Sequence, residues 1–214
     1  MKKEKQRSLF TAITFLVAFV LWTVAVRYVD TQAIGPREST VGFATLNGFF
    51  HKLTGVNMTL YTVTDWLGLV PIAVALGFAI LGLVQWIKRR NIFKVDYSIL
   101  ALGVFYVVVI AFYILFEYVV INRRPVLIDG YLEASYPSST TLLVTCVMPT
   151  AIMQLNTRIK SKAFRRCIIL VISLFIAFTV IGRLLSGVHW VTDIIGGALL
   201  SIGLVTAYHF GATR

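Results

Sequence analysis

The segment from Gly182 to Asp193 carries the residues with the most specific potential chemistry. His189 and Asp193 stand four residues apart, so on a helix they share one face and can contact each other. A carboxylate beside one imidazole nitrogen fixes the tautomer and leaves the other nitrogen as a base or nucleophile. Arg183 precedes them, and its planar guanidinium can bind two phosphoryl oxygens at once. Taken alone, the His–Asp spacing is equally consistent with a buried pair that only joins two helices.

Two further segments contain residue types that bind phosphate. One opens a helix with a proline and three hydroxyl residues: Pro137, Ser138, Ser139 and Thr140. Such a helix start offers capping hydroxyls and free backbone N–H groups, which together make an anion site. The other segment contains three adjacent residues, Arg123, Arg124 and Pro125. Each segment is weak evidence alone, but combined with the His–Asp pair they supply what phosphoryl transfer requires, namely charge stabilisation and an in-line nucleophile.

Metal and cofactor sites are not indicated. No glycine-rich phosphate loop follows a strand, and no cluster of histidine, cysteine and carboxylate residues has the spacing of metal ligands. The two cysteines, Cys146 and Cys167, each lie in an apolar run and are expected to be packed thiols. We therefore expect no cofactor and no metal.

The composition is that of an integral membrane protein. Of 214 residues, 58% are hydrophobic and 14% charged, and the mean hydropathy is +0.84, which excludes a disordered chain and an ordinary soluble domain. A bilayer-spanning helix needs roughly 20 mostly apolar residues. Six stretches qualify or nearly qualify: 9–26, 60–87, 97–121, 141–155, 167–185 and 191–210. We predict an all-α, six-transmembrane-helix bundle forming a single domain, residues 1–214.

The basic residues predict the orientation of this bundle. The net charge of +11 arises from 20 Lys and Arg against 9 Asp and Glu, and fourteen of the bases lie at alternate ends of the spans, at both termini and in the 88–94 and 158–166 loops. By the positive-inside rule, both termini face the cytoplasm. The charge thus reflects membrane topology, and nucleic acid is not expected as a partner. The three segments that could bind phosphate all fall on the opposite, outer side.

At this point the sequence resembles the membrane-integrated type 2 phosphatidic acid phosphatase superfamily. That family has a six-helix core and three motifs, KxxxxxxRP, PSGH and SRxxxxxHxxxD. Here Arg124-Pro125 matches the end of the first motif, and Pro137-Ser138 the start of the second. The third motif is matched in spacing by three residues, Arg183, His189 and Asp193. The resemblance covers the last four spans closely.

The resemblance implies a metal-independent lipid phosphatase with a phosphohistidine intermediate. His189 would attack phosphorus while Asp193 orients it. The phosphoryl oxygens would be held by arginines and by the start of a helix: Arg124, Arg183, Ser138, Ser139 and Thr140. Arg123 would supply the charge that the family's lysine gives, because Glu117 stands at the lysine position and would repel phosphate.

A second departure concerns the general acid. Thr140 stands where the family has the histidine that protonates the leaving group, and losing such an acid costs about 10²–10⁴-fold in rate. The cost is smaller for a diphosphate ester, because its leaving group is a weaker base. We therefore favour a polyprenyl diphosphate as substrate, with phosphatidic acid or phosphatidylglycerophosphate as further candidates. We expect a multi-pass protein of a bacterial plasma membrane, surrounded by membrane lipids.

Two alternatives remain open from the sequence. Glu117 and Thr140 favour a catalytically impaired relative that binds a phosphorylated lipid or a membrane partner. A small transporter with a His189–Asp193 proton relay would predict ionisable residues near the membrane midplane, whereas these residues cluster at one interface. A further segment, 31–59, has apolar residues at helical spacing and predicts a helix lying in the outer interface.

Overall fold

Helices form nearly all of the regular structure of the protein. The computed structural model describes residues 2–212, and within them no strand forms. The elements are α1 (Lys2–Tyr28), the short 3₁₀ helix η1 (Pro36–Glu38), α2 (Ala44–Thr54), α3 (Met58–Leu67), α4 (Leu69–Arg89), the short 3₁₀ helix η2 (Ile92–Lys94), α5 (Tyr97–Tyr118), α6 (Ser139–Arg158), α7 (Lys162–Leu185) and α8 (Val191–Ala212). The all-α class predicted from the sequence is confirmed.

In the part of the chain that the structure describes, five helical segments are long and apolar enough to cross a membrane. They are Lys3–Tyr28, Met58–Arg89, Tyr97–Tyr118, Lys162–Leu185 and Val191–Ala212. In Met58–Arg89, only 11% of an 18-residue apolar stretch is buried inside the protein. In α8, 61% of the corresponding stretch is buried. The outer helices therefore present large apolar side chains on the protein's own surface, which is the distribution expected of helices that face lipid.

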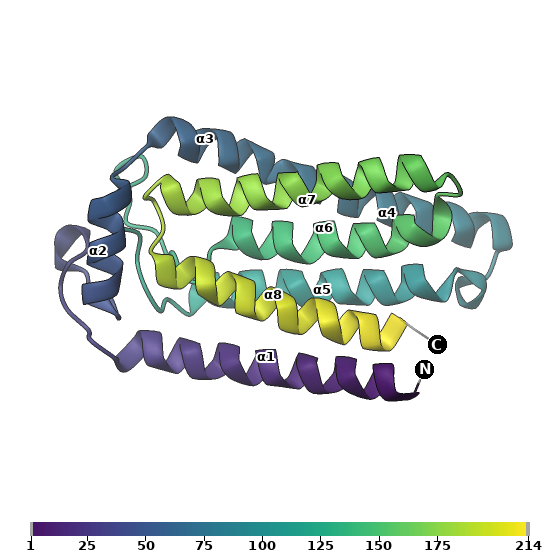
Figure 1. Cartoon of the computed structure of the whole chain (residues 1–214), viewed down its shortest axis with the longest axis horizontal. Coiled ribbons are helices and arrows are strands. Elements are labelled where there is room, and N and C mark those ends of the chain that lie inside the picture. Colours follow the sequence, from purple (N-terminus) through teal and green to yellow (C-terminus); the bar gives the residue numbers. More distant parts are fainter. Residues whose placement is uncertain (1, 213–214) are drawn as a thin grey trace.

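The remaining predicted span, 141–155, corresponds to α6, which runs among the long helices (Figure 1). Unlike the five segments above, α6 is not apolar enough to be identified as a span by composition, because polar residues are distributed along it. These side chains bond inside the bundle: Thr150 Oγ1 donates to the Cys146 carbonyl at 3.0 Å, and Gln154 Nε2 donates to the Ser98 carbonyl at 3.2 Å. Hydrogen bonding within the protein lets a polar helix occupy the interior, and the six-span count stays a prediction.

The predicted span 60–87 is two helices, α3 and α4, with a break at Gly68. Pro71 lies in the first turn of α4, and its ring would clash with the carbonyl four residues earlier in a continuous helix. At the break, the backbone N–H of Gly68 bonds to the carbonyls of Thr64 and Asp65. A β-carbon on Gly68 would lie 2.8 Å from the Asp65 carbonyl oxygen, so the bend requires glycine here.

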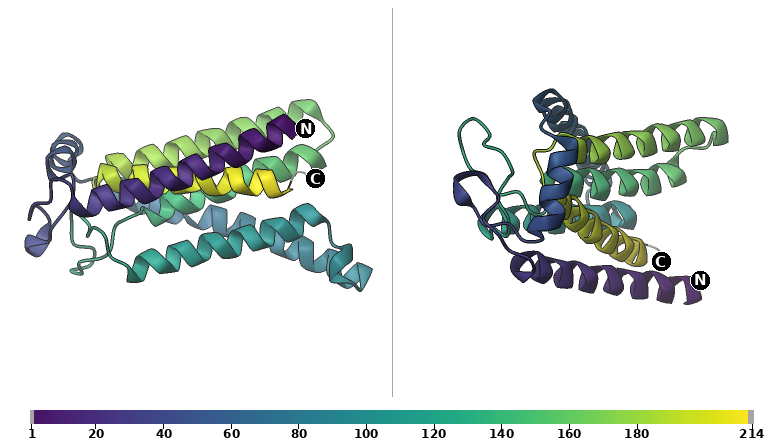
Figure 2. Two further views of the ribbon diagram at one scale, coloured as in Figure 1. Left: turned by 90° about the horizontal axis from the view of Figure 1, so that it is seen from below. Right: turned by 60° about the vertical axis from the view of Figure 1, so that its left-hand side comes forward.

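The two ends of the bundle differ in character. The N- and C-termini lie together at one end, and α2 crosses the other end beside the irregular loops (Figures 1 and 2). The helix predicted within 31–59 is confirmed as α2. Asn47 is fully buried and fastens α2 to the start of α8, donating to Thr192 Oγ1 at 3.0 Å and accepting from Thr192 N at 3.3 Å.

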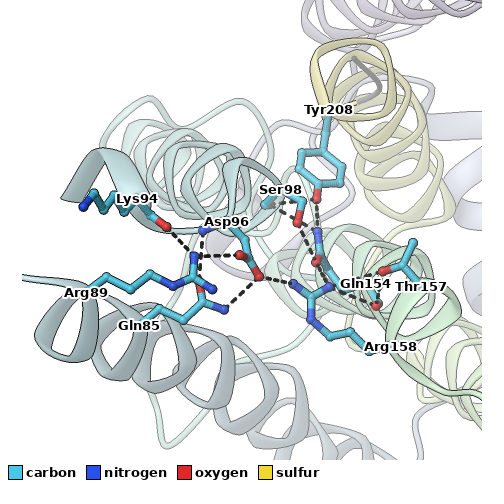
Figure 3. A network of polar contacts seen from close by, with 9 residues as sticks. All are labelled: Gln85, Arg89, Lys94, Asp96, Ser98, Gln154, Thr157, Arg158 and Tyr208. Carbon is cyan, nitrogen blue, oxygen red and sulfur yellow. Dashed lines mark hydrogen bonds and ion pairs between the residues drawn. The ribbon is translucent and has the colours of Figure 1, made fainter. Parts of the chain in front are cut away.

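A polar network joins four helices at the end that holds the termini (Figure 3). Asp96, just before α5, accepts from Gln85 and Arg89 of α4 at 2.9 Å each. Its carboxylate also lies 3.7 Å from the guanidinium of Arg158 in α6. These hydrogen bonds from Gln85 and Arg89 lower the pKa of Asp96 below its ordinary value, so the carboxylate stays charged and holds these helix ends together.

Candidate active site

The loop between α7 and α8 places a histidine between an acid and an arginine. His189 Nδ1 lies 3.5 Å from Asp193 Oδ2, and His189 Nε2 lies 3.2 Å from Arg124 Nη1. The backbone N–H of Trp190 donates to Asp193 Oδ2 at 3.0 Å, which fixes the carboxylate at the start of α8. The structure thus brings together three residues that the sequence separates by up to 69 positions.

The geometry assigns the tautomer of His189. A guanidinium has only donors, so the nitrogen facing Arg124 must be the acceptor. The proton is therefore on Nδ1, toward Asp193, and Nε2 keeps its lone pair. Burial, followed by the charges of Arg124 and Arg183, lowers the pKa of His189 well below its ordinary value of 6.5. The imidazole is neutral at physiological pH, which is the state a nucleophile needs.

Arg183, at the end of α7, is a buried cation with few partners. Its side chain is 1% exposed, its Nη2 lies 3.3 Å from Asp65 Oδ1, and its guanidinium carbon lies 4.9 Å from the centre of the Tyr61 ring. Its Nε and Nη1 atoms are buried and have no hydrogen-bond partner among residues 2–212. Burying a cation costs several kcal/mol of free energy, whereas an ion pair with a half-exposed carboxylate contributes only about 1 kcal/mol. Donors left open at this cost indicate a site for an anion.

The start of α6 adds backbone donors. Ser138 is fully buried and caps the helix, since its Oγ accepts from Thr141 N at 3.4 Å. Its own N–H donates to the Asp193 carbonyl at 3.1 Å, so the helix start is attached directly to the His–Asp pair. The N–H groups of Ser139 and Thr140 have no hydrogen-bond partner within the described residues. Free amides at a helix start bind anions.

A cavity of about 220 Å³ opens beside Arg124, His189 and Ser139, whereas Arg183 lies behind its lining. Its polar lining includes Arg124, His189, Ser139, Glu133 and Glu117. One wall is apolar and comes from α5: Phe112, Tyr113 and Phe116. The volume exceeds that of several water molecules, which take roughly 30 Å³ each, so a phosphoryl group fits.

Three predicted residues are placed differently from the rest. Arg123 turns away from the cavity, donating from Nη1 to the Leu132 carbonyl at 2.8 Å, and it lines a separate hollow with Glu38. The expectation that Arg123 binds phosphate is not supported by this placement. Glu117 is exposed at the end of α5 and lines the cavity. A β-carbon on Gly68 would lie 3.5 Å from the Thr140 methyl carbon. The Thr140 side chain therefore packs toward the bend between α3 and α4.

Sequence reasoning missed three residues that contact the site arginines. Tyr61 and Asp65 come from α3, and Glu133 comes from the loop before α6, where its Oε2 lies 2.9 Å from Arg124 Nε. The Arg124 guanidinium carbon lies 5.8 Å from the centre of the Tyr61 ring. Tyr61 and Asp65 are four residues apart and so share a helix face. This spacing could have indicated a polar face on the helix, but nothing in it linked α3 to the distant arginines.

Comparison with known proteins gives one family match and one similar structure. Residues 117–213 match the PAP2 superfamily, the type 2 phosphatidic acid phosphatases. The fold resembles that of a transmembrane PAP2-type phosphatidylglycerolphosphate phosphatase from Bacillus subtilis, with a TM-score of 0.59 and 17% sequence identity over 94% of each chain. No curated protein sequence matches the chain significantly. The family match, which covers less than half of the chain, and the similar fold together support the assignment to the PAP2 lipid phosphatases.

Proposed function

We propose that this protein hydrolyses a phosphorylated lipid, with polyprenyl diphosphate preferred, through a phosphohistidine at His189. The observation that carries the proposal is the position of the His189 imidazole, with Nδ1 toward Asp193 and Nε2 beside Arg124. Nε2 forms a bond to phosphorus while the bond from phosphorus to the leaving-group oxygen breaks. Water then bonds to phosphorus as the Nε2–P bond breaks, which releases phosphate and one proton.

The preference for a diphosphate follows from the absence of an acid at Thr140. Thr140 stays at the helix start, where its N–H group can bind an oxygen but its hydroxyl is a poor acid. A phosphate monoester leaves without needing a full proton, whereas an alkoxide does. Phosphatidic acid and phosphatidylglycerophosphate have alkoxide leaving groups, so they are the slower substrates in this proposal.

We also propose that the site faces the outside of a bacterial plasma membrane. The termini, the 88–94 loop and the 158–166 loop share one end of the bundle, and the site lies at the other (Figure 1). The first end carries most of the basic residues, which favours the cytoplasm. Phosphate would then be released on the outer side.

Phosphate release by the purified protein tests the activity. Undecaprenyl diphosphate, phosphatidic acid and phosphatidylglycerophosphate are compared at matched detergent dilution with a chelator present, and His189→Ala is the control. We expect release that the substitution abolishes, fastest with the diphosphate. Faster hydrolysis of phosphatidic acid than of the diphosphate would overturn the substrate preference.

A second candidate is a binding protein that has lost catalysis, because Thr140 replaces the acid and the carboxylate of Glu117 lines the cavity. It predicts lipid binding by folded protein without release from any of the three lipids.

A further inference from the structure

Each of the two site arginines is paired with one carboxylate that reaches it from the protein surface. Glu133 Oε2 lies 2.9 Å from Arg124 Nε, and the two side chains are 42% and 9% exposed. Asp65 Oδ1 lies 3.3 Å from Arg183 Nη2, and these side chains are 56% and 1% exposed. In both pairs the cation is buried in the site and the anion keeps much of its contact with solvent.

These contacts lie where a phosphoryl group would need donors. Glu133 Oε2 lies 2.9 Å from Arg124 Nε as an ion pair without a well-aligned hydrogen bond, and Arg124 Nη1 contacts His189 Nε2 at 3.2 Å. A bidentate grip on phosphate takes two N–H donors from one edge of the guanidinium. An attacking His189 must also have its Nε2 lone pair free. The contacts of Arg124 with Glu133 and His189 must therefore be exchanged before phosphorus can be bound and attacked.

We propose that Glu133 and Asp65 are internal counterions, which hold Arg124 and Arg183 while the site is empty and yield them to the phosphoryl group of the substrate. This inference rests on the proposed function, because it concerns the same site. The carboxylates offset the two buried charges in the absence of substrate. By competing with phosphate, they also weaken the binding of the product and favour its release.

The balance of interactions permits such an exchange. A partly exposed ion pair contributes little free energy because water screens it, and a carboxylate that leaves it is rehydrated readily. A phosphate with two negative charges gains charge-assisted hydrogen bonds from both arginines and from the amides at the start of α6. Tyr61 lies beside both guanidinium groups, so the cation–π contacts keep them in place while their anion changes.

The two pairs come from different parts of the chain. Glu133 is held near Arg124 by the backbone, because Arg124 N donates to the Glu133 carbonyl at 3.1 Å. Asp65 lies in α3, outside the region that matches the superfamily. Gly182 allows α3 to approach, since a β-carbon there would lie 2.7 Å from the Thr64 methyl carbon. The second counterion thus depends on close packing between α3 and α7.

Binding of inorganic phosphate to the full-length protein in detergent tests the proposal independently of turnover. Isothermal titration calorimetry compares the wild type with Glu133→Gln and Asp65→Asn, which remove a charge without changing size. We expect each variant to bind phosphate about threefold to tenfold more tightly, in line with partly exposed ion pairs. Without phosphate, Asp65→Asn should have a lower Tm, because Arg183 loses its counterion, and added phosphate should restore it. Glu38→Gln is the matched control, since this exposed acid lines a different hollow with Arg123.

The sign of the change decides between the alternatives. If the carboxylates only orient the arginines, both variants bind phosphate more weakly than the wild type, and the proposal is overturned. An equal gain in Glu38→Gln would attribute the effect to overall charge and would also overturn it. The proposed function is tested separately, by measuring the release of phosphate from lipid with His189→Ala as the control. Tighter phosphate binding without any lipid hydrolysis would support the counterions and reject the enzyme.

Discussion

At the residue scale, the protonation state of His189 determines what the site can do. The imidazole is buried beside two arginines, and both the burial and the charges oppose its protonation. Asp193 is also fully buried, and its contacts with Trp190 and His189 keep it in one orientation. The two residues therefore present a neutral imidazole whose unprotonated nitrogen faces Arg124.

The first prediction concerns the titration of this histidine. Because its pKa is lowered, His189 stays neutral as the pH falls through 6.5 and gains a proton only at lower pH. The chain has three histidines, so NMR of ¹⁵N-labelled protein can follow each one, with His189→Gln identifying its signal. A midpoint for His189 at or above 6.5 would contradict the environment described.

The second prediction concerns the partner of His189. Asp193→Asn keeps the size of the side chain but removes the carboxylate that holds the proton on Nδ1. We expect kcat to fall by about 10²–10⁴-fold with little change in KM, as when the orienting acid of a catalytic histidine is lost. Steady-state kinetics with the preferred lipid measures both constants. A variant with nearly normal kcat would show that the carboxylate has only a structural role.

At the element scale, the site depends on helices that approach each other closely. Gly182 lets α7 pack on α3, and Gly196 lets α8 pack on the ring of Tyr136, where a β-carbon would lie 2.5 Å from the ring. Tyr136 is 1% exposed, and its hydroxyl lies 2.7 Å from Thr23 Oγ1 of α1. These contacts set the position of the α6 start relative to His189.

The third prediction tests the α3–α7 contact. Gly182→Ala places a methyl group against Thr64 and should lower stability by about 1–3 kcal/mol, the usual cost of overpacking. Phosphate release should fall as well, because Asp65 and Tyr61 move away from Arg183. Gly77→Ala in α4 is the matched control, since nothing lies within 4 Å of a β-carbon there. Thermal unfolding in detergent compares the two, and equal Tm values would refute the contact's importance.

At the scale of the whole molecule, the bundle separates two chemical surfaces. The turn between α7 and α8, which holds His189, and the start of α6 lie at one end, and the termini lie at the opposite end (Figure 1). The second end also holds the Asp96 network, whose residues are drawn in Figure 3. Between them, α1, α4, α5 and α7 expose large apolar side chains. This arrangement fits a protein that spans a bilayer with its site at one interface.

The fourth prediction tests the orientation in the membrane. In a background with Cys167→Ser, which leaves only the buried Cys146, single cysteines are introduced as Thr40→Cys and Lys160→Cys. A membrane-impermeant maleimide should label Thr40→Cys in intact cells and Lys160→Cys only after permeabilisation. Equal labelling of both after permeabilisation is the control, and the reverse pattern in intact cells would place the site in the cytoplasm.

Much of the fold could be predicted from the sequence because lipid imposes simple rules. Long apolar runs must be helices, since no water satisfies their backbone groups, and the structure confirms an all-helical fold with five apolar segments long enough to span a membrane. The spacing of Arg183, His189 and Asp193 identified the chemistry, because a helix and its preceding turn bring residues at such spacing together. The composition also favoured a membrane protein from the start.

The tertiary structure alone decided which charged groups share the site. Tyr61 and Asp65 look like ordinary residues of an apolar helix, and they reach Arg183 only because α3 packs on α7. Arg123 and Arg124 are adjacent in sequence, yet the pairing of Arg123 with Ala134 turns their side chains toward different hollows. Local sequence predicts periodicity and helix ends, whereas partners distant along the chain are set by packing, and for this reason the carboxylates beside the arginines could not be foreseen.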